Sequence, residues 1–90
     1  MIITKTSLEN KYILDSLASD LKRVALGLHR GSNQMANKFL DEALKRKKEL
    51  NKNNIQQYIQ NLLNNIDKNM SSDYALMCST LIQNYTHNLK

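Results

Sequence analysis

Two residues of this 90-residue chain, Arg23 and His29, have side chains whose types could support catalysis together. A guanidinium can stabilise the negative charge of a phosphorane, and an imidazole can move a proton near neutral pH. On one helix, such a pair would suit the cleavage of RNA. Six positions along a helix, however, turn the two side chains about 120° away from each other. The spacing alone therefore does not bring them to one reacting phosphate.

The arginine-to-histidine spacing resembles the motif of the HEPN class of helical ribonucleases. This resemblance would imply an RNA-cleaving enzyme in which Arg23 and His29 are catalytic. The match covers these two residues, and Val24 stands where the motif usually carries a polar residue. Ribonuclease activity is thus the lesser alternative. We expect a non-enzymatic protein without catalytic residues.

The remaining reactive side chains indicate neither a metal site nor a nucleophile. His87 has no second histidine or pair of carboxylates beside it, and Cys78 falls among apolar residues at helical spacing. A zinc site needs three or four convergent ligands, and a cysteine on an apolar face is usually a small core residue. We therefore expect no metal and no cofactor. The single cysteine and the absence of a long apolar run predict a cytoplasmic protein that does not enter a membrane.

Positive charge is concentrated in the middle third of the chain. Residues 22–52 hold nine basic and three acidic side chains, whereas the flanking thirds are almost neutral and the formal net charge is +5. A block of this kind suggests a surface for an anionic partner, such as nucleic acid or an acidic protein. The solvated surface of an ordinary helix is an equally good interpretation. The run Lys45-Arg46-Lys47-Lys48, for example, would stabilise a helix C-terminus.

The residues around Gly31 have the outline of a helix-turn-helix, whose second helix enters the major groove of DNA with its first residues. Asparagine and glutamine suit adenine, whereas lysine and arginine suit guanine and phosphate. Ser32 stands where a packed motif prefers an apolar residue, and Asp41 and Glu42 would lie near phosphates. The candidate nucleic-acid-binding residues are Arg30, Asn33, Gln34, Asn37, Lys38 and Lys45.

The apolar pattern predicts an all-α fold. The chain has no proline and two glycines, and apolar residues recur three and four positions apart. Gly31 suits a left-handed helix cap, although the apolar rhythm also permits one long helix through Ser32. Short turns predict antiparallel neighbours, and therefore a small up-down four-helix bundle in a single domain, 1–90. The expected helices span about 7–30, 33–50, 54–68 and 72–89.

One stretch of the first expected helix, Val24-Ala25-Leu26-Gly27-Leu28, is apolar all the way round. Such a segment has to be enclosed on several sides, and small helical domains often gain stability by association. We therefore expect a homodimer with Val24, Leu26 and Leu28 at its interface. A monomer offers the least reason for an apolar side chain at Leu26.

The function predicted from the sequence is a non-enzymatic, small, basic helical interaction module that self-associates. The alternative is a nucleic-acid-binding protein that uses the helix-turn-helix-like element around Gly31. The position of the largest exposed apolar patch relative to the basic surface distinguishes two kinds of partner. A patch opposite the basic surface favours a DNA-binding dimer, whereas a coincident patch favours an acidic protein.

Overall fold

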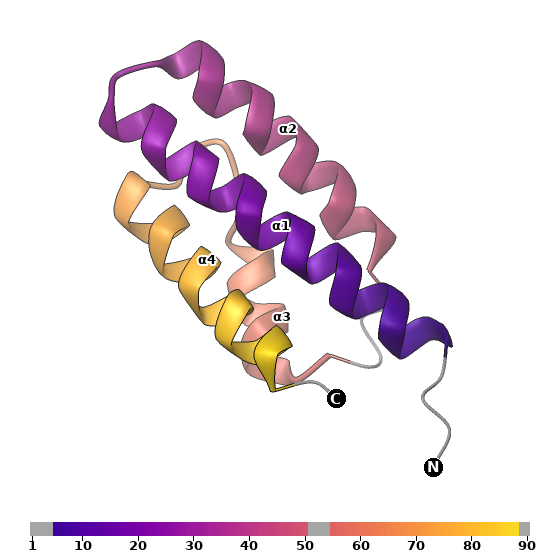
Figure 1. The fold of residues 1–90 in the computed structure, drawn as a ribbon. Coiled ribbons are helices and arrows are strands. Elements are labelled where there is room, and N and C mark those ends of the chain that lie inside the picture. Colours follow the sequence, from indigo (N-terminus) through magenta and orange to yellow (C-terminus); the bar gives the residue numbers. More distant parts are fainter. Residues whose placement is uncertain (1–4, 51–54, 89–90) are drawn as a thin grey trace.

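The computed structural model describes residues 5–50 and 55–88, with side chains from Asn10 onward, and these residues form four helices. They are α1 (Lys5–His29), α2 (Asn33–Glu49), α3 (Gln57–Asn64) and α4 (Ser72–His87). Each helix runs opposite to the one before it (Figure 1). The predicted all-α bundle is thus confirmed. The expected start of the third helix at Asn54 and the end of the fourth at Leu89 lie outside the described residues.

A tight turn separates α1 from α2, so the two are not one fused helix. Gly31 has a φ of 75°, the left-handed conformation that glycine adopts without a steric penalty. The N–H of Ser32 donates to the carbonyl of Gly27 at 2.8 Å, and the N–H of Gly31 donates to Leu28 at 3.2 Å. These two bonds form a Schellman motif, which satisfies carbonyls at the end of α1. The Ser32 hydroxyl then caps α2 by accepting from the N–H of Met35.

The α1–α2 hairpin is closely packed near this turn. A Cβ atom added to Gly27 would lie 2.8 Å from the backbone nitrogen of Ala36 and 3.1 Å from its Cα. Only a residue without a side chain lets the two backbones approach this far. Further down the hairpin, buried Asp20 of α1 pairs with Arg46 of α2, with 2.9 Å between Oδ2 and Nε.

Helix α1 is the central element, with α2 and α4 packed along it (Figure 1). Its stripe of buried residues at spacings of three and four faces both neighbours. The α4 side also carries a buried hydrogen bond, in which the Ser79 hydroxyl donates to the Ala18 carbonyl at 2.7 Å. The buried apolar residues of α1, α2 and α4 are Leu14, Leu17, Ala18, Leu21, Val24, Ala25, Ala36, Leu40, Ala43, Ala75, Cys78, Ile82 and Tyr85.

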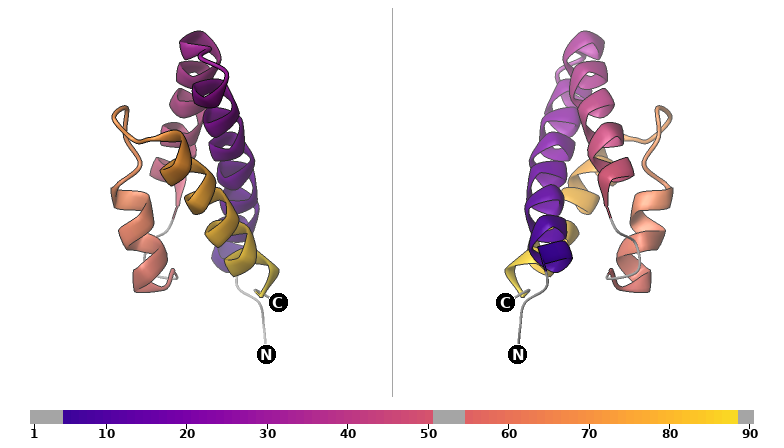
Figure 2. Two further views of the ribbon diagram at one scale, coloured as in Figure 1. Left: turned by 90° about the vertical axis from the view of Figure 1, so that its left-hand side faces the viewer. Right: turned by 90° about the vertical axis from the view of Figure 1, so that its right-hand side faces the viewer.

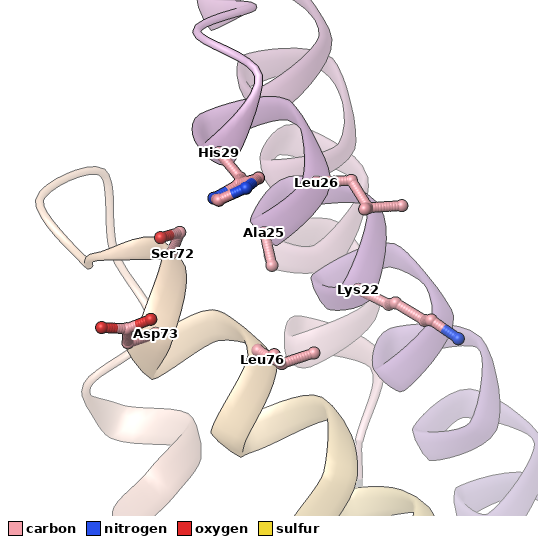
Figure 3. Close-up of a pocket in the computed structure, with 7 residues that line it drawn as sticks. All are labelled: Lys22, Ala25, Leu26, His29, Ser72, Asp73 and Leu76. Carbon is pink, nitrogen blue, oxygen red and sulfur yellow. The ribbon is translucent and has the colours of Figure 1, made fainter.

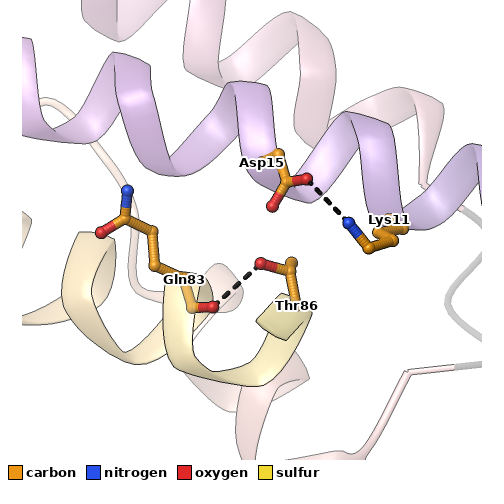
Figure 4. A network of polar contacts seen from close by, with 4 residues as sticks. All are labelled: Lys11, Asp15, Gln83 and Thr86. Atoms are coloured by element: carbon orange, nitrogen blue, oxygen red, sulfur yellow. Dashed lines mark hydrogen bonds and ion pairs between the residues drawn. The ribbon is translucent and has the colours of Figure 1, made fainter. Parts of the chain in front are cut away.

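Polar side chains border the other end of the α1–α4 contact (Figure 4). Lys11 and Asp15, one turn apart on α1, form an ion pair of 3.3 Å. On the facing part of α4, the buried Thr86 hydroxyl donates to the carbonyl of Gln83 at 2.9 Å. Each of these two bonds stays within its own helix.

Helix α3 is shorter than predicted and lies beside α4, away from α1 (Figure 2). Eight residues are too few for a stable isolated helix, and two tyrosines of α4 hold its ends. The Tyr85 hydroxyl accepts from the N–H of Gln56 at 3.3 Å, and the Tyr74 hydroxyl donates to the Leu62 carbonyl at 3.2 Å.

The expected end of the third helix near residue 68 is wrong, because α3 stops at Asn64. Ile66 follows the apolar rhythm and is buried, but it reaches the core from a turn rather than a helix. The turn is closed by Asp67, whose carboxylate accepts from the N–H of Asn69 at 2.8 Å. Aspartate favours such local bonds over helix continuation.

Candidate functional site

An open depression of about 310 Å³ lies between the C-terminal half of α1 and the start of α4. Its buried base is Ala25, whose small side chain leaves room between larger neighbours. Leu76 projects from α4 toward α1, while Leu26 and Lys22 project from α1 one turn apart (Figure 3). His29, Ser72 and Asp73 complete the lining at the end near the α1–α2 turn.

The two leucines of this depression are unusually exposed for their type. Leu26 is 40% exposed and Leu76 is 50% exposed, although most leucines of the described chain are buried or packed against the core. Exposed apolar side chains that gather at a hollow are typical of a surface that another molecule covers. A single exposed leucine would need no such explanation.

A second depression continues the first along α1 and shares Lys22 and Leu26 with it. Its other lining residues are Ser19 and Arg23 of α1 and Gln83 of α4. We call the two together the α1–α4 groove. From Ser19 to His29 the groove follows α1 for about 15 Å, at a rise of 1.5 Å per residue. The leucines lie between two polar ends of the groove, with Ser19, Arg23 and Gln83 at one end and His29, Ser72 and Asp73 at the other.

The apolar surface formed by Leu26 and Leu76 therefore coincides with part of the basic segment, whereas Met77 and Leu81 of α4 are exposed outside the groove. Lys22 and Arg23 are exposed within the groove, and Arg30 is exposed just beyond the end of α1. Asp73 is the one carboxylate among the lining residues. The sequence identified Leu26 but missed Leu76, because Leu76 lies off the apolar stripe of its helix. Only its place opposite Leu26 makes it part of a site.

The three predicted interface residues have different surroundings. Val24 is 1% exposed and belongs to the core of the single chain, while Leu28 is partly buried against that core. Neither offers a second molecule a protruding side chain. Of the three predicted interface residues, only Leu26 has a side chain that is exposed to a second molecule. The Val24–Leu28 stretch is enclosed on most sides by α2 and α4 of its own chain.

All of the predicted nucleic-acid-binding residues are exposed, namely Arg30, Asn33, Gln34, Asn37, Lys38 and Lys45. They lie at the end of α1 and along α2, and exposed Asp41 stands among them. However, α1 and α2 lie alongside each other as an antiparallel hairpin (Figure 1), whereas the helices of a helix-turn-helix cross at about 90–120°. Helix α2 thus presents its side, rather than its N-terminal end, to the surroundings.

The basic residues of the middle segment do not form one uninterrupted surface. Arg46 is committed to the ion pair with Asp20. The guanidinium of Arg23 lies 5.4 Å from the ring centre of Phe39, and the ammonium of Lys38 lies 5.9 Å from it. These cation–π contacts restrain both side chains on the α2 side of α1. Lys22 instead lines both hollows of the groove from α1.

The structure does not bring Arg23 and His29 to one site. The guanidinium of Arg23 lies over a ring of α2, whereas His29 lines the groove beside Ser72 of α4. Both residues therefore line the α1–α4 groove, but the charged end of Arg23 is directed to the α2 side of α1, whereas His29 lies at the end of the groove near the α1–α2 turn. A phosphate held by one would be out of reach of a proton on the other, so the geometry offers no support for the ribonuclease alternative.

Cys78 is fully buried, and desolvation raises the pKa of its thiol despite a hydrogen bond with Tyr74. Burial also raises the pKa of Tyr74. A thiol held in its neutral form is a poor nucleophile and metal ligand. Among the side chains described in residues 10–50 and 55–88, no three of histidine, cysteine, aspartate or glutamate converge as a metal site would require. None of the helices described has the length and hydropathy needed to span a membrane.

No known protein family, characterised protein or solved structure matches this chain. The interpretation of the α1–α4 groove therefore rests on its own residues.

Proposed function

We propose that this protein is a non-enzymatic interaction module that acts by docking another polypeptide chain in the α1–α4 groove. The observation that carries the proposal is the pairing of two half-exposed leucines, Leu26 and Leu76, across one hollow. Covering apolar surface is the main favourable term in protein association.

Size-exclusion chromatography with light scattering and fluorescence anisotropy with labelled amphipathic helical peptides test this function. We expect self-association or peptide binding at micromolar concentration, lost in Leu26→Gln and in Leu76→Gln. Leu81→Gln is the matched control, because Leu81 is an exposed leucine of α4 that does not line the groove. A strictly monomeric protein that binds no peptide of any charge would rule the proposal out.

Nucleic-acid binding is the second candidate, and the exposure of all six predicted residues favours it. Their placement suits contact with phosphates from the side of the α1–α2 hairpin rather than insertion of a recognition helix. It predicts binding to duplex DNA or RNA that weakens steeply with salt and on Lys38→Glu. If no mobility shift is seen with either duplex at low salt, this candidate is eliminated.

A further inference from the structure

We propose that the occupant of the α1–α4 groove is an acidic amphipathic helix of another protein, with apolar side chains on Leu26 and Leu76 and carboxylates beside Lys22 and Arg23. This inference rests on the proposed function and names its partner class. Three properties support it: the shape of the groove, its charge and the symmetry of a contact between two copies of the chain.

The shape of the groove fits a helix. It is an elongated hollow between two packed helices, about 15 Å long on the α1 side, which corresponds to roughly three turns of a docked helix. The described residues include no strand whose edge could extend a sheet with an incoming peptide. Peptides that bind to helical surfaces commonly lay one apolar face in a groove, with anchors three or four residues apart.

The distribution of charge fits an acidic partner. Lys22 is exposed between the two hollows and forms no ion pair with another described residue. The stem of Arg23 lines the second hollow while its guanidinium lies over Phe39. A guanidinium stacked by its face keeps N–H donors at its edge, so it can still bind a carboxylate. Against these cations, the lining residues offer the single carboxylate of Asp73.

A second copy of the chain fits the same surface less well. A dimer with two-fold symmetry places identical patches face to face, so residues near the axis meet their own equivalents. In a contact centred on Leu26, antiparallel α1 helices would set Lys22 of one copy against Arg30 of the other, and parallel helices would set Lys22 against its own equivalent. Opposed like charges disfavour such an interface. A chain that carries glutamate or aspartate at these positions meets no such repulsion.

Four matched peptides test the inference by fluorescence anisotropy. The first is a fluorescein-labelled alanine–glutamate helix with leucines along one face. In the second, glutamine replaces every glutamate; in the third, lysine does. The fourth keeps its glutamates but has serine in place of the leucines. We expect the first to bind and the fourth not to bind. The glutamine peptide should bind roughly two- to thirtyfold more weakly at low salt, as expected for two surface ion pairs.

Charge reversal locates the interaction. Lys22→Glu should weaken binding of the glutamate peptide and strengthen binding of the lysine peptide. Lys45→Glu changes the net charge equally, but it lies on α2 outside the groove and should leave both affinities unchanged. Circular dichroism of each variant checks that it is folded. Because Lys22 and Lys45 are both exposed, neither change disturbs the core.

Four other outcomes would overturn the inference, and each would point to a different conclusion about the groove. Equal binding of the glutamate and glutamine peptides would leave the docking function standing and remove the acidic partner. Dimerisation through Leu26 without peptide binding would identify a second copy as the occupant. Displacement of the peptide by duplex DNA, together with loss of DNA binding in Lys22→Glu, would identify nucleic acid instead. A monomer that binds none of the four peptides would remove the inference and the proposed function together.

Discussion

Replacing Gly27 by alanine should destabilise the protein, although alanine is the better helix former. In an unconstrained helix the exchange stabilises by about 0.8–1.0 kcal/mol. Here the new Cβ would lie 2.8 Å from the nitrogen of Ala36 and 3.1 Å from its Cα. These are backbone atoms, so α2 has to move as a unit. Overpacking of this kind costs about 1–3 kcal/mol, which leaves a net loss of about 1 kcal/mol.

Thermal and urea denaturation followed by circular dichroism measure this loss. For a chain of this size, a net loss of 1 kcal/mol should lower Tm by about 4–8 °C. Ala36→Gly should not rescue the variant, because it removes only the contact with the Ala36 Cβ, at 3.2 Å, and leaves the shorter backbone contact. The matched control compares Asn37→Ala with Asn37→Gly, which gives the glycine-to-alanine difference at an exposed position of α2.

The sign of the effect decides whether the reasoning holds. If Gly27→Ala is as stable as the wild type or more stable, while the Asn37 pair shows the usual alanine advantage, then close backbone contact does not fix the hairpin. The spacing of α1 and α2 would then need another cause.

Three further perturbations have expected outcomes. Gly31→Ala should lower stability by about 1–2 kcal/mol because of the φ of 75° alone, since nothing lies within 4 Å of the added Cβ. Gly31→Asn should lower it less. Equal stability of the wild type and both variants in urea would refute this. Arg46→Gln should cost about 1.5–3 kcal/mol, because it leaves the buried carboxylate of Asp20 without its charged partner. Lys11→Gln should cost less than about 0.5 kcal/mol in the same titration, because the carboxylate of its partner Asp15 is half-exposed. The native Cys78 thiol should react with Ellman's reagent only as fast as the protein opens. Burial raises the pKa of the thiol above its value in the unfolded chain. The contribution of the neutral thiol to stability is therefore complete at neutral pH and is lost as pH rises above about 8.5. The stability difference between wild type and Cys78→Ala should consequently shrink between about pH 7 and pH 10. A constant difference, or rapid labelling of the folded protein, would contradict the assignment of this thiol to the core.

Much of the fold could be predicted because its signals are local. The apolar spacing located all four helices, and Ser32 and Ser71 cap α2 and α4 by accepting from N–H groups three residues later. The length of α3 could not be predicted in the same way. Its apolar rhythm continues to Ile66, but the backbone leaves the helix at Asn65. Periodicity reports which side chains face the core, and a turn can present a side chain to the core as well as a helix can.

The candidate site was predicted only in part. The apolar surplus around Leu26 was visible in the sequence, and so was the basic block that includes Lys22 and Arg23. Nothing in the sequence linked Leu26 with Leu76, fifty positions later, or Asp20 with Arg46. The tyrosines at positions 74 and 85 likewise gave no local sign that their hydroxyls hold the two ends of α3.

By itself, the sequence determined that the chain is helical, approximately where the four helices lie, and that Gly31 suits a turn between the first two. These properties follow from caps, from glycine and from side-chain spacing within a few residues. The tertiary structure alone decided which residues off the buried stripes become neighbours. Those neighbours depend on the axial shift and rotation of each helix against the next. Contacts between helices fix this alignment, such as Gly27 with Ala36 and Ser79 with Ala18. The α1–α4 groove is a product of that alignment, because Leu26 and Leu76 line the same hollow only when α1 and α4 are packed in this register.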